Sequence, residues 1–541
     1  MNVNNRLTTS AIVSSVILSL LAGCSTGNTG TATNTTPTAT TPGTTPAETA
    51  KQTPTKFSMM LPLYNTEAPA ADSPLIKKVE EFANVKLDLN FVPSANYNDR
   101  VNISIASNEL PQAITILDMK SPTFVNAVRS GMFWDVTSYL KSMPTFAKNY
   151  DPKLIANALT DGKNYGLPRG RPMARNAIIL RKDWLAKVGL QKPTNIDELY
   201  NVIKAFATKD PDGNGKDDTA GLLMGVDGSG NIAGYAFDVI VCMFGGGNNW
   251  ELKDGKVVPT FMSEPYMNAL KWVKKLYDEK LLNQDFAIVK GSEQVFELID
   301  KERGGMYINN FSDAADRQDN LVKLVQQRNP ALAGKSIADA KMDLIDTAYL
   351  IKSTDGTVRS PAQPGFNGVL AFPKTSVKTE AELKAILTAF DKLDTPEGQA
   401  LIKWGIEGTH YTNQNGVPTV VGNTALVSKE VNTVWQMFLT NQVVDRSSIQ
   451  GKSSPMTEKI LKEQEDNLKN IVVDVSVPLL SATVSTNGTE LTKIINTARI
   501  KYITGVIDDE GWKQAIDQWR KTGGDKVIQE YTEARAKLDG K

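Results

Sequence analysis

The chain has 541 residues, and its 60 Lys and Arg side chains balance its 60 Asp and Glu side chains. This balance argues against nucleic acid as a partner, because proteins that bind nucleic acid need a basic surface. The length is sufficient for two or three ordinary domains, and the two cysteines cannot form a disulfide framework.

The N-terminal segment has the pattern of a secretory signal peptide. Arg6 supplies a positive charge, and the apolar run over 11–22 is shorter than the ~20 residues that span a bilayer. Leu-Ala-Gly precedes Cys24, which resembles the lipobox of bacterial lipoproteins. We therefore predict a signal peptide over 1–23 and acyl chains, palmitate among them, on Cys24. These would hold the protein on the extracellular face of the cell membrane. The alternative is an ordinary signal peptide with a chance Cys.

Residues 24–55 consist mainly of Thr, Pro, Ala, Gly and Asn. Such a segment has too few large apolar side chains to offset the entropy lost on ordering. We predict a flexible tether here.

Order is predicted from Lys56 onward, where strands and helices alternate. The apolar spacing predicts, in chain order, strand 57–63, helix 74–84, strand 85–92, helix 97–106 and strand 112–117. This order is typical of an α/β domain with a mainly parallel sheet. Ligands bind at the carboxyl ends of such strands, so Tyr64 and Asp118 are candidate ligand-binding residues on one rim.

Further elements continue the alternation. We predict a turn over 161–168, strand 176–180, helix 194–207, helix 265–281, strand 304–310, strand 368–373, helix 380–390 and a helical tail over 490–541. No internal repeat interrupts this order.

Several motifs together carry a resemblance to a known family. In chain order they are Ala106–Pro111, Asp161–Pro168, Arg181–Leu185, Asp210–Asp218, Gly405–Tyr411, and the closing Trp512, Trp519 and Gly523–Gly524. They resemble the substrate-binding proteins of ABC importers, extracellular solute-binding protein family 1. The long lipoprotein branch for oligosaccharide and polysaccharide uptake in Gram-positive bacteria is the most similar. Gln112 departs from this pattern, because relatives usually carry an acid there.

The resemblance implies a two-lobed, periplasmic-binding-protein-like α/β fold of type II, with hinge-linked lobes and a ligand cleft. The expected boundaries are 56–170 for the first lobe, 171–365 for the second lobe, 366–425 for the return to the first lobe, and 426–541 for the rest of the second lobe. Connections are expected near 169–176 and 363–370. The implied function is capture of an oligosaccharide by hinge closure and its delivery to ABC permease subunits by a monomer.

The segment 210–218 has the spacing of an EF-hand loop. Oxygen ligands stand at its first, third, fifth and ninth positions, and Gly215 stands at the sixth. The predicted ligands of a structural Ca²⁺ are Asp210, Asp212, Asn214, the backbone carbonyl of Lys216, and Asp218. The twelfth position is Gly221, not Glu, so a weak site is expected. A polar turn without a cation is the alternative.

Some candidate ligand-binding residues come from aromatic and amide chemistry. Trp250 follows three consecutive glycines, and its flat ring suits the apolar face of a sugar, although ordinary packing is the alternative. Asn309 and Asn310 end a predicted strand whose tip faces the cleft in the family. Their amides both donate and accept hydrogen bonds, as sugar hydroxyls require, but turn formation explains them equally.

Other candidates come from motif and charge. His410, the only histidine, and Tyr411 lie in the family-like motif and are expected to help shape the cleft, with a structural role as the alternative. Arg169, Arg171 and Arg175 lie at the first connection. They can pair with an acidic sugar through two-point contacts or tie the lobes together.

No catalytic constellation stands out. The single histidine argues against a serine hydrolase, as does the lack of a Gly-x-Ser-x-Gly elbow that precedes a helix, and a zinc site lacks histidines and paired cysteines. We therefore predict a binding protein and not an enzyme. The alternatives are a surface glycosidase or polysaccharide lyase, a protein that binds a peptide or another solute, and a binding protein for a membrane sensor.

Overall fold

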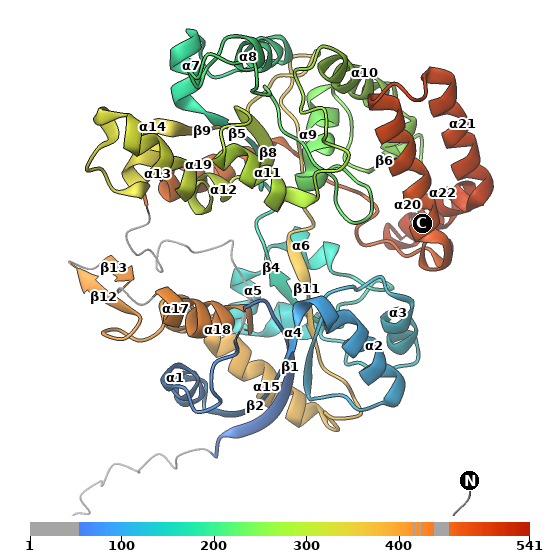
Figure 1. Ribbon diagram of the computed structural model, residues 1–541. Coiled ribbons are helices and arrows are strands. Elements are labelled where there is room, and N and C mark those ends of the chain that lie inside the picture. Colours follow the sequence, from blue (N-terminus) through green and yellow to red (C-terminus); the bar gives the residue numbers. More distant parts are fainter. Residues whose placement is uncertain (1–52, 66, 415–416, 421–423, 438–453, 541) are drawn as a thin grey trace, which may run out of the picture. The chain divides into compact units, whose positions relative to one another are not determined.

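The five strands of the first lobe form a sheet in the order β2-β1-β3-β11-β4 (Figure 1). Their bounds are β1 Thr55–Leu63, β2 Val85–Pro93, β3 Ala113–Ile116, β4 Gly166–Gly170 and β11 Phe366–Ala371. β1 is parallel to β2 and β3, but β11 is antiparallel to β3 and β4. The prediction of a parallel sheet thus holds for the first three strands, because β11 enters from the second lobe.

This is a computed structural model, which describes residues 53–540 except 66, 415–416, 421–423 and 438–453. Residues 53–541 cluster as one compact unit. The predicted signal peptide, Cys24 and nearly all of the tether lie outside the described residues. Among the described helices, none is both long and apolar enough to cross a membrane.

Helices cover both faces of the first sheet. They are α1 Pro74–Ala83, α2 Tyr97–Ser107, α3 Pro122–Arg129, α4 Thr137–Ser142, α5 Pro144–Asn149, α6 Pro152–Asn157, α15 Glu380–Leu393, α16 Pro396–Trp404, α17 Thr424–Leu426 and α18 Asn432–Met437. Side chains alternate along β1, so Met59 packs with α1 and α15 on one face and Met60 packs with α2 and α3 on the other. A hairpin of β12 (Tyr411–Gln414) and β13 (Val417–Val420) follows α16.

The second lobe has a three-stranded sheet in the order β8-β5-β9. The strands are β5 Asn176–Arg181, β8 Met306–Asn310 and β9 Ile345–Ala348, and both outer strands are antiparallel to β5. Its helices are α7 Lys182–Val188, α8 Ile196–Thr208, α9 Ala236–Met243, α10 Glu264–Asp278, α11 Gly291–Asp300, α12 Asp313–Asp316, α13 Asp319–Arg328, α14 Ile337–Leu344, α19 Pro455–Asn467, α20 Ala482–Ile503, α21 Asp509–Trp519 and α22 Asp525–Leu538. Short strands complete it: β6 Trp250–Lys253, β7 Lys256–Pro259, β10 Ser360–Pro361 and β14 Ile471–Val472.

Two neighbouring segments connect the sheets. One runs from β4 to β5 and the other from β10 to β11. The backbone N–H of Arg171 donates to the carbonyl of Gly365 at 2.7 Å, and the N–H of Gln363 donates to the carbonyl of Met173 at 2.9 Å. The segments therefore lie side by side, at the positions where connections between the lobes were expected.

The expected change of lobe after residue 425 is placed too early. Val431, Val434 and Met437 pack in the same core as Leu75 of α1, so α18 belongs to the first lobe. Met456 of α19, by contrast, packs in a core of the second lobe. The chain therefore changes lobe between these two helices. Apolar spacing alone does not distinguish the two cores, because it predicts that one face of a helix is buried but not which elements pack against that face.

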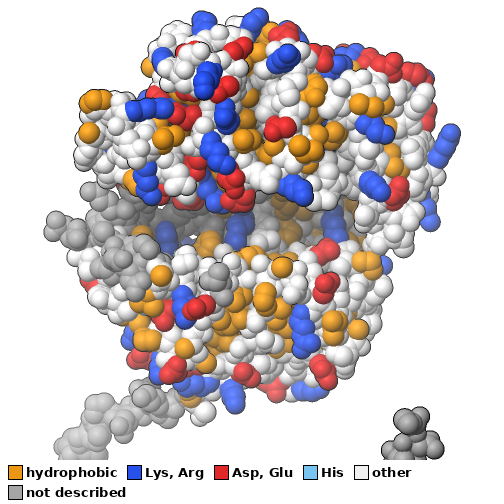
Figure 2. Space-filling model, viewed as in Figure 1, with side chains coloured by type: hydrophobic (Ala, Val, Ile, Leu, Met, Phe, Trp, Pro, Cys, Tyr) orange, Lys and Arg blue, Asp and Glu red, His pale blue; other side chains and the backbone are white. Residues whose placement is uncertain are grey.

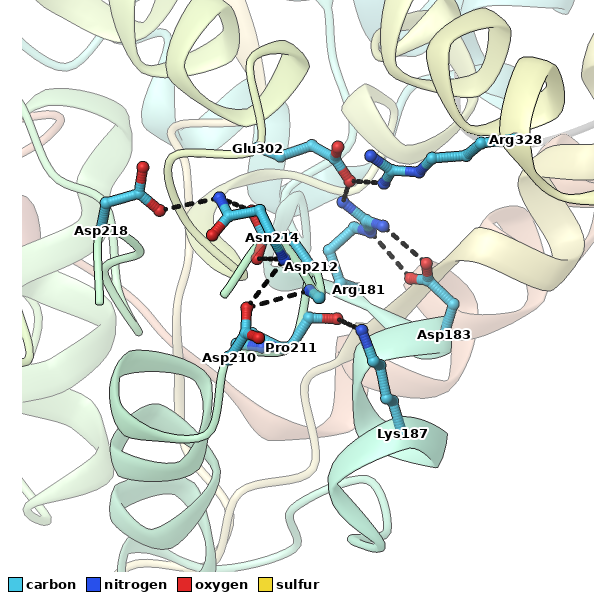
Figure 3. Close-up of polar contacts among 11 residues, drawn as sticks. Arg181, Asp183, Lys187, Asp210, Pro211, Asp212, Asn214, Asp218, Glu302 and Arg328 are labelled. Carbon is cyan, nitrogen blue, oxygen red and sulfur yellow. Dashed lines mark hydrogen bonds and ion pairs between the residues drawn. The ribbon is translucent and has the colours of Figure 1, made fainter. Parts of the chain in front are cut away.

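A buried ion-pair network stabilises the start of α7 (Figure 3). The side chain of Arg181 is 1% exposed. Its guanidinium donates to Asp183 at 2.7 and 2.5 Å and to Oε1 of Glu302 at 3.0 Å. Its central carbon lies 4.6 Å from the ring centroid of Trp184. Arg328 pairs with the same Glu302 oxygen from the surface side.

Candidate ligand-binding site

Three arginines lie along the first connection between the sheets. Arg169 is 2% exposed and donates from Nη1 to the carbonyl of Asn367 at 2.9 Å. Arg171 and Arg175 are partly exposed. Arg175 donates from Nη1 to Oε1 of Gln363, on the second connection, at 3.3 Å. The two connections thus hold the three guanidinium groups close together.

The side chains of α18 complete the surroundings of these arginines. Gln436 accepts hydrogen bonds from Nη2 of Arg169 at 3.1 Å and from Nη2 of Arg171 at 3.4 Å. The guanidinium carbon of Arg171 lies 5.3 Å from the ring centroid of Trp435. Arg171 is therefore held by an amide and an aromatic ring, neither of which carries a negative charge.

Within the described ranges, none of the three arginines forms an ion pair of 4 Å or less. Burial lowers the pKa of Arg175, and the charge of Asp313 opposes this effect. Burial and the charges of Arg169 and Arg175 lower the pKa of Arg171 to about 10. Like charges that are held together in a partly desolvated place favour the binding of an anion. The space-filling view shows the surface hollowed between the two lobes, with Lys and Arg side chains visible in the hollow (Figure 2).

Tyr64 adjoins this cluster from the end of β1. Its side chain is 47% exposed, and its phenol acts on the pKa of both Arg169 and Arg171. The structure therefore brings together Tyr64 and the three arginines, four of the residues selected from the sequence. Nearby, the buried hydroxyl of Tyr97 donates to the carbonyl of Met60 at 2.8 Å.

Asp118 lies on the loop after β3, as expected from the rim of a parallel sheet. Its Oδ1 accepts a hydrogen bond from the backbone N–H of Lys120 at 3.0 Å. Lys120 in turn donates from Nζ to the carbonyl of Ser476 at 2.9 Å, which links the first lobe to the second. Asp118 thus accepts a hydrogen bond from the backbone of a lysine whose side chain links the two lobes.

Asn309 and Asn310 end β8, opposite β5. The side chain of Asn309 is 6% exposed and lies against Gly234, where a Cβ atom would come within 2.8 Å of a backbone oxygen. Oδ1 of Asn310 accepts from Nε2 of Gln363 at 3.0 Å. Asn310 therefore belongs to the amide network beside Arg175.

Trp250 packs inside the second lobe. Its ring centroid lies 4.9 Å from that of Tyr531, in an edge-to-face arrangement, and 6.2 Å from that of Trp519. These contacts agree with the packing alternative, so we do not keep Trp250 as a ligand-binding candidate. The glycines before it allow the chain to turn toward β6, with Gly245 at φ 85°.

His410 is buried and has partners on both ring nitrogens. Nδ1 accepts from the backbone N–H of Ile406 at 3.0 Å, and Nε2 lies 3.1 Å from Oε2 of Glu430. This is the structural role named as the alternative, and no ring nitrogen is left for a ligand. The ring of Tyr411 packs on Trp404 at a centroid distance of 6.3 Å. We therefore remove His410 from the candidate site, whereas Tyr411 is partly exposed and its expected place at the cleft stays a prediction.

The EF-hand-like loop forms a compact turn after α8 (Figure 3). The carboxylate of Asp210 accepts backbone N–H bonds from residues 213, 214 and 215 at 3.0 to 3.1 Å. The amide of Asn214 donates to Asp212 at 2.7 Å and to Asp218 at 3.1 Å. Arg303 pairs with the other oxygen of Asp218 at 2.7 Å. The predicted side chains thus converge.

Comparisons with known proteins place the fold in a family. A family model described as bacterial extracellular solute-binding protein matches residues 65–335. The chain is also 38% identical over 480 residues to the polygalacturonan/rhamnogalacturonan-binding protein YtcQ of Bacillus subtilis (strain 168), covering 88% of this chain and 91% of YtcQ. The chain belongs to the bacterial extracellular solute-binding proteins.

Two further matches agree with this membership. Lipoprotein LipO of Bacillus subtilis (strain 168) is 33% identical over 485 residues, which cover 87% of this solute-binding protein and 90% of LipO. An HMO-binding, ABC-transporter-associated solute-binding protein of Bifidobacterium longum infantis has a TM-score of 0.67 at 18% identity, covering 90% of this chain and 99% of that one. The latter match supports the two-lobed fold alone.

Sequence analysis missed several residues of this solute-binding protein that adjoin the arginines. They are Tyr235, Asp313, Trp435 and Gln436. Tyr235 carried one local signal, because it follows Gly234 and precedes an apolar helix. The others come from distant segments, so no spacing in the sequence relates them.

Proposed function

We propose that the protein captures an oligosaccharide containing uronic acid residues and delivers it to the permease subunits of an ABC importer. The observation that carries this proposal is the cluster of Arg169, Arg171 and Arg175, which has no ion-pair partner within the described ranges. Arg forks match carboxylates in two-point contacts. The polygalacturonan/rhamnogalacturonan-binding relative supports an acidic ligand.

In this proposal the ligand favours closure of the two lobes. The connections that carry Arg171 and Gln363 are joined by backbone hydrogen bonds and serve as the hinge. A ligand that contacts both lobes stabilises the closed form, because in the open form it loses its contacts with one lobe. The permease then recognises the closed form of a monomeric binding protein.

The test is a thermal-shift and calorimetric comparison of the purified protein with oligogalacturonates and with neutral oligosaccharides of equal length. A ligand at about 100 times its Kd adds about 2.7 kcal/mol to the unfolding free energy, so uronic ligands are expected to raise the melting temperature by several degrees. The ligand should be recovered intact. Cleaved product would instead support a glycosidase or lyase. A shift with peptides alone would contradict the proposal.

We further propose that two acyl chains on Cys24 anchor the protein to the extracellular face of the membrane, with 24–55 as the tether. The lipoprotein relative supports this. Replacing Cys24 with Ser is expected to move the protein from the membrane fraction to the medium, because one lost modification removes both chains. Cys242→Ala, at the buried second cysteine, is the control and should stay with the membrane. Retention of the Cys24→Ser variant would contradict the anchor.

A weak structural Ca²⁺ is also proposed for Asp210, Asp212, Asn214, Lys216 and Asp218. Burial, a hydrogen bond with Asp210 and the charges of Asp210 and Asp218 raise the pKa of Asp212, as expected for carboxylates that are held close together. Within the described residues, no three Asp, Glu, His or Cys side chains suffice as a metal site. A cation would therefore also need the Asn214 side-chain oxygen and the Lys216 carbonyl.

Calcium is expected to stabilise the second lobe only modestly. At ten times a Kd of roughly 10⁻⁴–10⁻³ M, binding adds about 1.4 kcal/mol, or a few degrees in melting temperature. The measurement is a melting curve after chelation, with and without added Ca²⁺. Asp210→Asn with Asp212→Asn should abolish the shift, whereas Asp254→Asn, in the exposed β6–β7 turn, should keep it. No shift in the unsubstituted protein would exclude the site.

A further inference from the structure

The two connections between the sheets lie side by side and contain a pair of opposed prolines (Figure 1). Two backbone hydrogen bonds, of 2.7 and 2.9 Å, join the connections in antiparallel register. In this register Pro172 lies opposite Pro364, and one of the two bonds lies on each side of the pair. A proline has no N–H to donate, so neither proline can donate a backbone hydrogen bond to the other connection.

The segment that leads up to Pro364 is held by the second lobe. The carbonyl of Pro361 accepts a hydrogen bond from Nδ2 of Asn176, at the start of β5, at 2.9 Å. Nε2 of Gln363 donates to Oδ1 of Asn310, at the end of β8, at 3.0 Å. Both partners belong to the three-stranded sheet, so this part of the connection moves with that sheet.

Asn248 holds the same segment from a second direction. It is 2% exposed, and its Nδ2 donates to the carbonyls of Ala362 at 2.8 Å and Val472 at 3.0 Å. The glycines before it allow the chain to approach α9 closely, because a Cβ atom on Gly246 would come within 2.5 Å of Cγ1 of Val241. The glycine run before β6 therefore leads into an amide that clamps the connection to the second lobe.

From Pro364 onward the contacts are with the first lobe. The carbonyl of Pro364 accepts from Nδ2 of Asn157, in α6, at 2.9 Å. On the other connection, Nη2 of Arg171 donates to the side chain of Gln436, in α18, at 3.4 Å. The hydrogen-bond partners thus change from one lobe to the other directly at the proline pair.

The same boundary separates two of the arginines of the candidate site. The backbone carbonyl of Arg175 accepts from the N–H of Phe311 at 2.7 Å, and its Nη1 donates to Gln363 at 3.3 Å. Both contacts lie on the second-lobe side of the prolines, whereas Arg171 contacts α18 on the first-lobe side.

We propose that the pivot of lobe closure lies at Pro172 and at Pro364–Gly365. Arg171 then moves with the first lobe, and Arg175 moves with the second. A ligand carboxylate that is bound by both guanidinium groups ties the lobes together, and this part of the inference rests on the proposed function. Gln363 is the positioning residue that holds Arg175 on its side of the pivot.

The physical reason lies in the backbone and in the charges. Hinges concentrate a change of φ and ψ in a few residues, and Gly365, at φ 89°, has the freedom to absorb such a change. The Cα atoms of Arg171 and Arg175 are at most about 14 Å apart, so two long side chains can reach one carboxylate between them. Without an anion the like charges repel, and a carboxylate replaces this repulsion with attraction on both sides of the pivot.

The experiment measures affinity for tetragalacturonate by calorimetry and the decrease in radius of gyration at saturation by small-angle X-ray scattering. Arg175→Gln removes the charge on the second-lobe side. We expect it to lower the affinity about tenfold or more and to abolish most of the decrease in radius, because the ligand then holds mainly to the first lobe. Arg520→Gln, at an exposed ion pair with Asp525, is the control. A variant Arg175→Gln that contracts fully at saturation would overturn the separation of the arginines.

A second variant tests the position of the pivot. Pro364→Gly gives the open form more backbone freedom, so the affinity is expected to fall about two- to fivefold. Pro330→Gly, at an exposed position of the second lobe, loosens the unfolded chain equally and should leave the affinity unchanged. An unchanged affinity in Pro364→Gly would overturn the pivot at this position. The proposed function fails separately, if a neutral tetragalactoside binds the unsubstituted protein as tightly as tetragalacturonate does.

Discussion

Replacing Arg171 with Ala is expected to lower the affinity for an acidic oligosaccharide by at least about 30-fold, because truncating one partner of a partly buried charge pair typically costs 2–5 kcal/mol. Arg171 is the informative choice among the three arginines. Arg169 is almost fully buried and donates to backbone carbonyls, so its loss would disturb the fold as well. Calorimetry with an oligogalacturonate measures the change.

The unliganded Arg171→Ala variant should be as stable as the unsubstituted protein, or more stable. The substitution removes a positive charge that repels Arg169 and Arg175. Arg171→Lys should recover part of the affinity, since Lys restores the charge but not the two-point fork. Arg520→Ala, at an exposed ion pair with Asp525, is the control. An unchanged affinity in Arg171→Ala would remove the arginine cluster from the ligand site.

Replacing Arg181 with Met is expected to lower the free energy of unfolding of the second lobe by about 3 kcal/mol or more. Removing one member of a buried ion pair leaves an uncompensated charge, and such changes commonly cost 3–5 kcal/mol. Glu302 keeps its ion pair with Arg328, so we expect the loss in unfolding free energy to lie near the lower end of this range. Urea unfolding followed by tryptophan fluorescence measures it, because Trp184 packs on the guanidinium.

A double variant tests the reason for this loss. Arg181→Met with Glu302→Met removes both charges, so it should recover a large part of the stability lost in Arg181→Met. Hydrogen bonds to Arg328 and Arg181 outweigh burial and keep the pKa of Glu302 below its usual 4.5. The contribution of Glu302 is therefore present above about pH 4.5 and is lost as pH falls through its lower folded pKa. A double variant no more stable than Arg181→Met would contradict the ion-pair explanation.

Local sequence patterns determined most of the individual elements. The predicted strand 57–63 corresponds to β1 Thr55–Leu63, and the predicted helix 74–84 corresponds to α1 Pro74–Ala83. The period of apolar residues is a local property, so it is readable without knowing the fold. The same holds for the loop 210–218, whose predicted ligand residues lie within one turn and converge in the structure. Family-like motifs, spread over the chain, indicated the two-lobed architecture.

Only the tertiary structure decided which residues meet. His410 and Trp250 were selected for their chemistry. In the structure, however, His410 contacts Glu430 and Trp250 packs on Tyr531. Arg171 instead meets Trp435 of α18, and Arg175 meets Gln363. These pairs join segments that are far apart in the chain. One of these segments, α18, belongs to the first lobe, whereas the sequence analysis had assigned it to the second. Burial and electrostatic environment are properties of such long-range contacts, and for this reason a residue's type and spacing predict its possible chemistry but not whether a ligand can reach it.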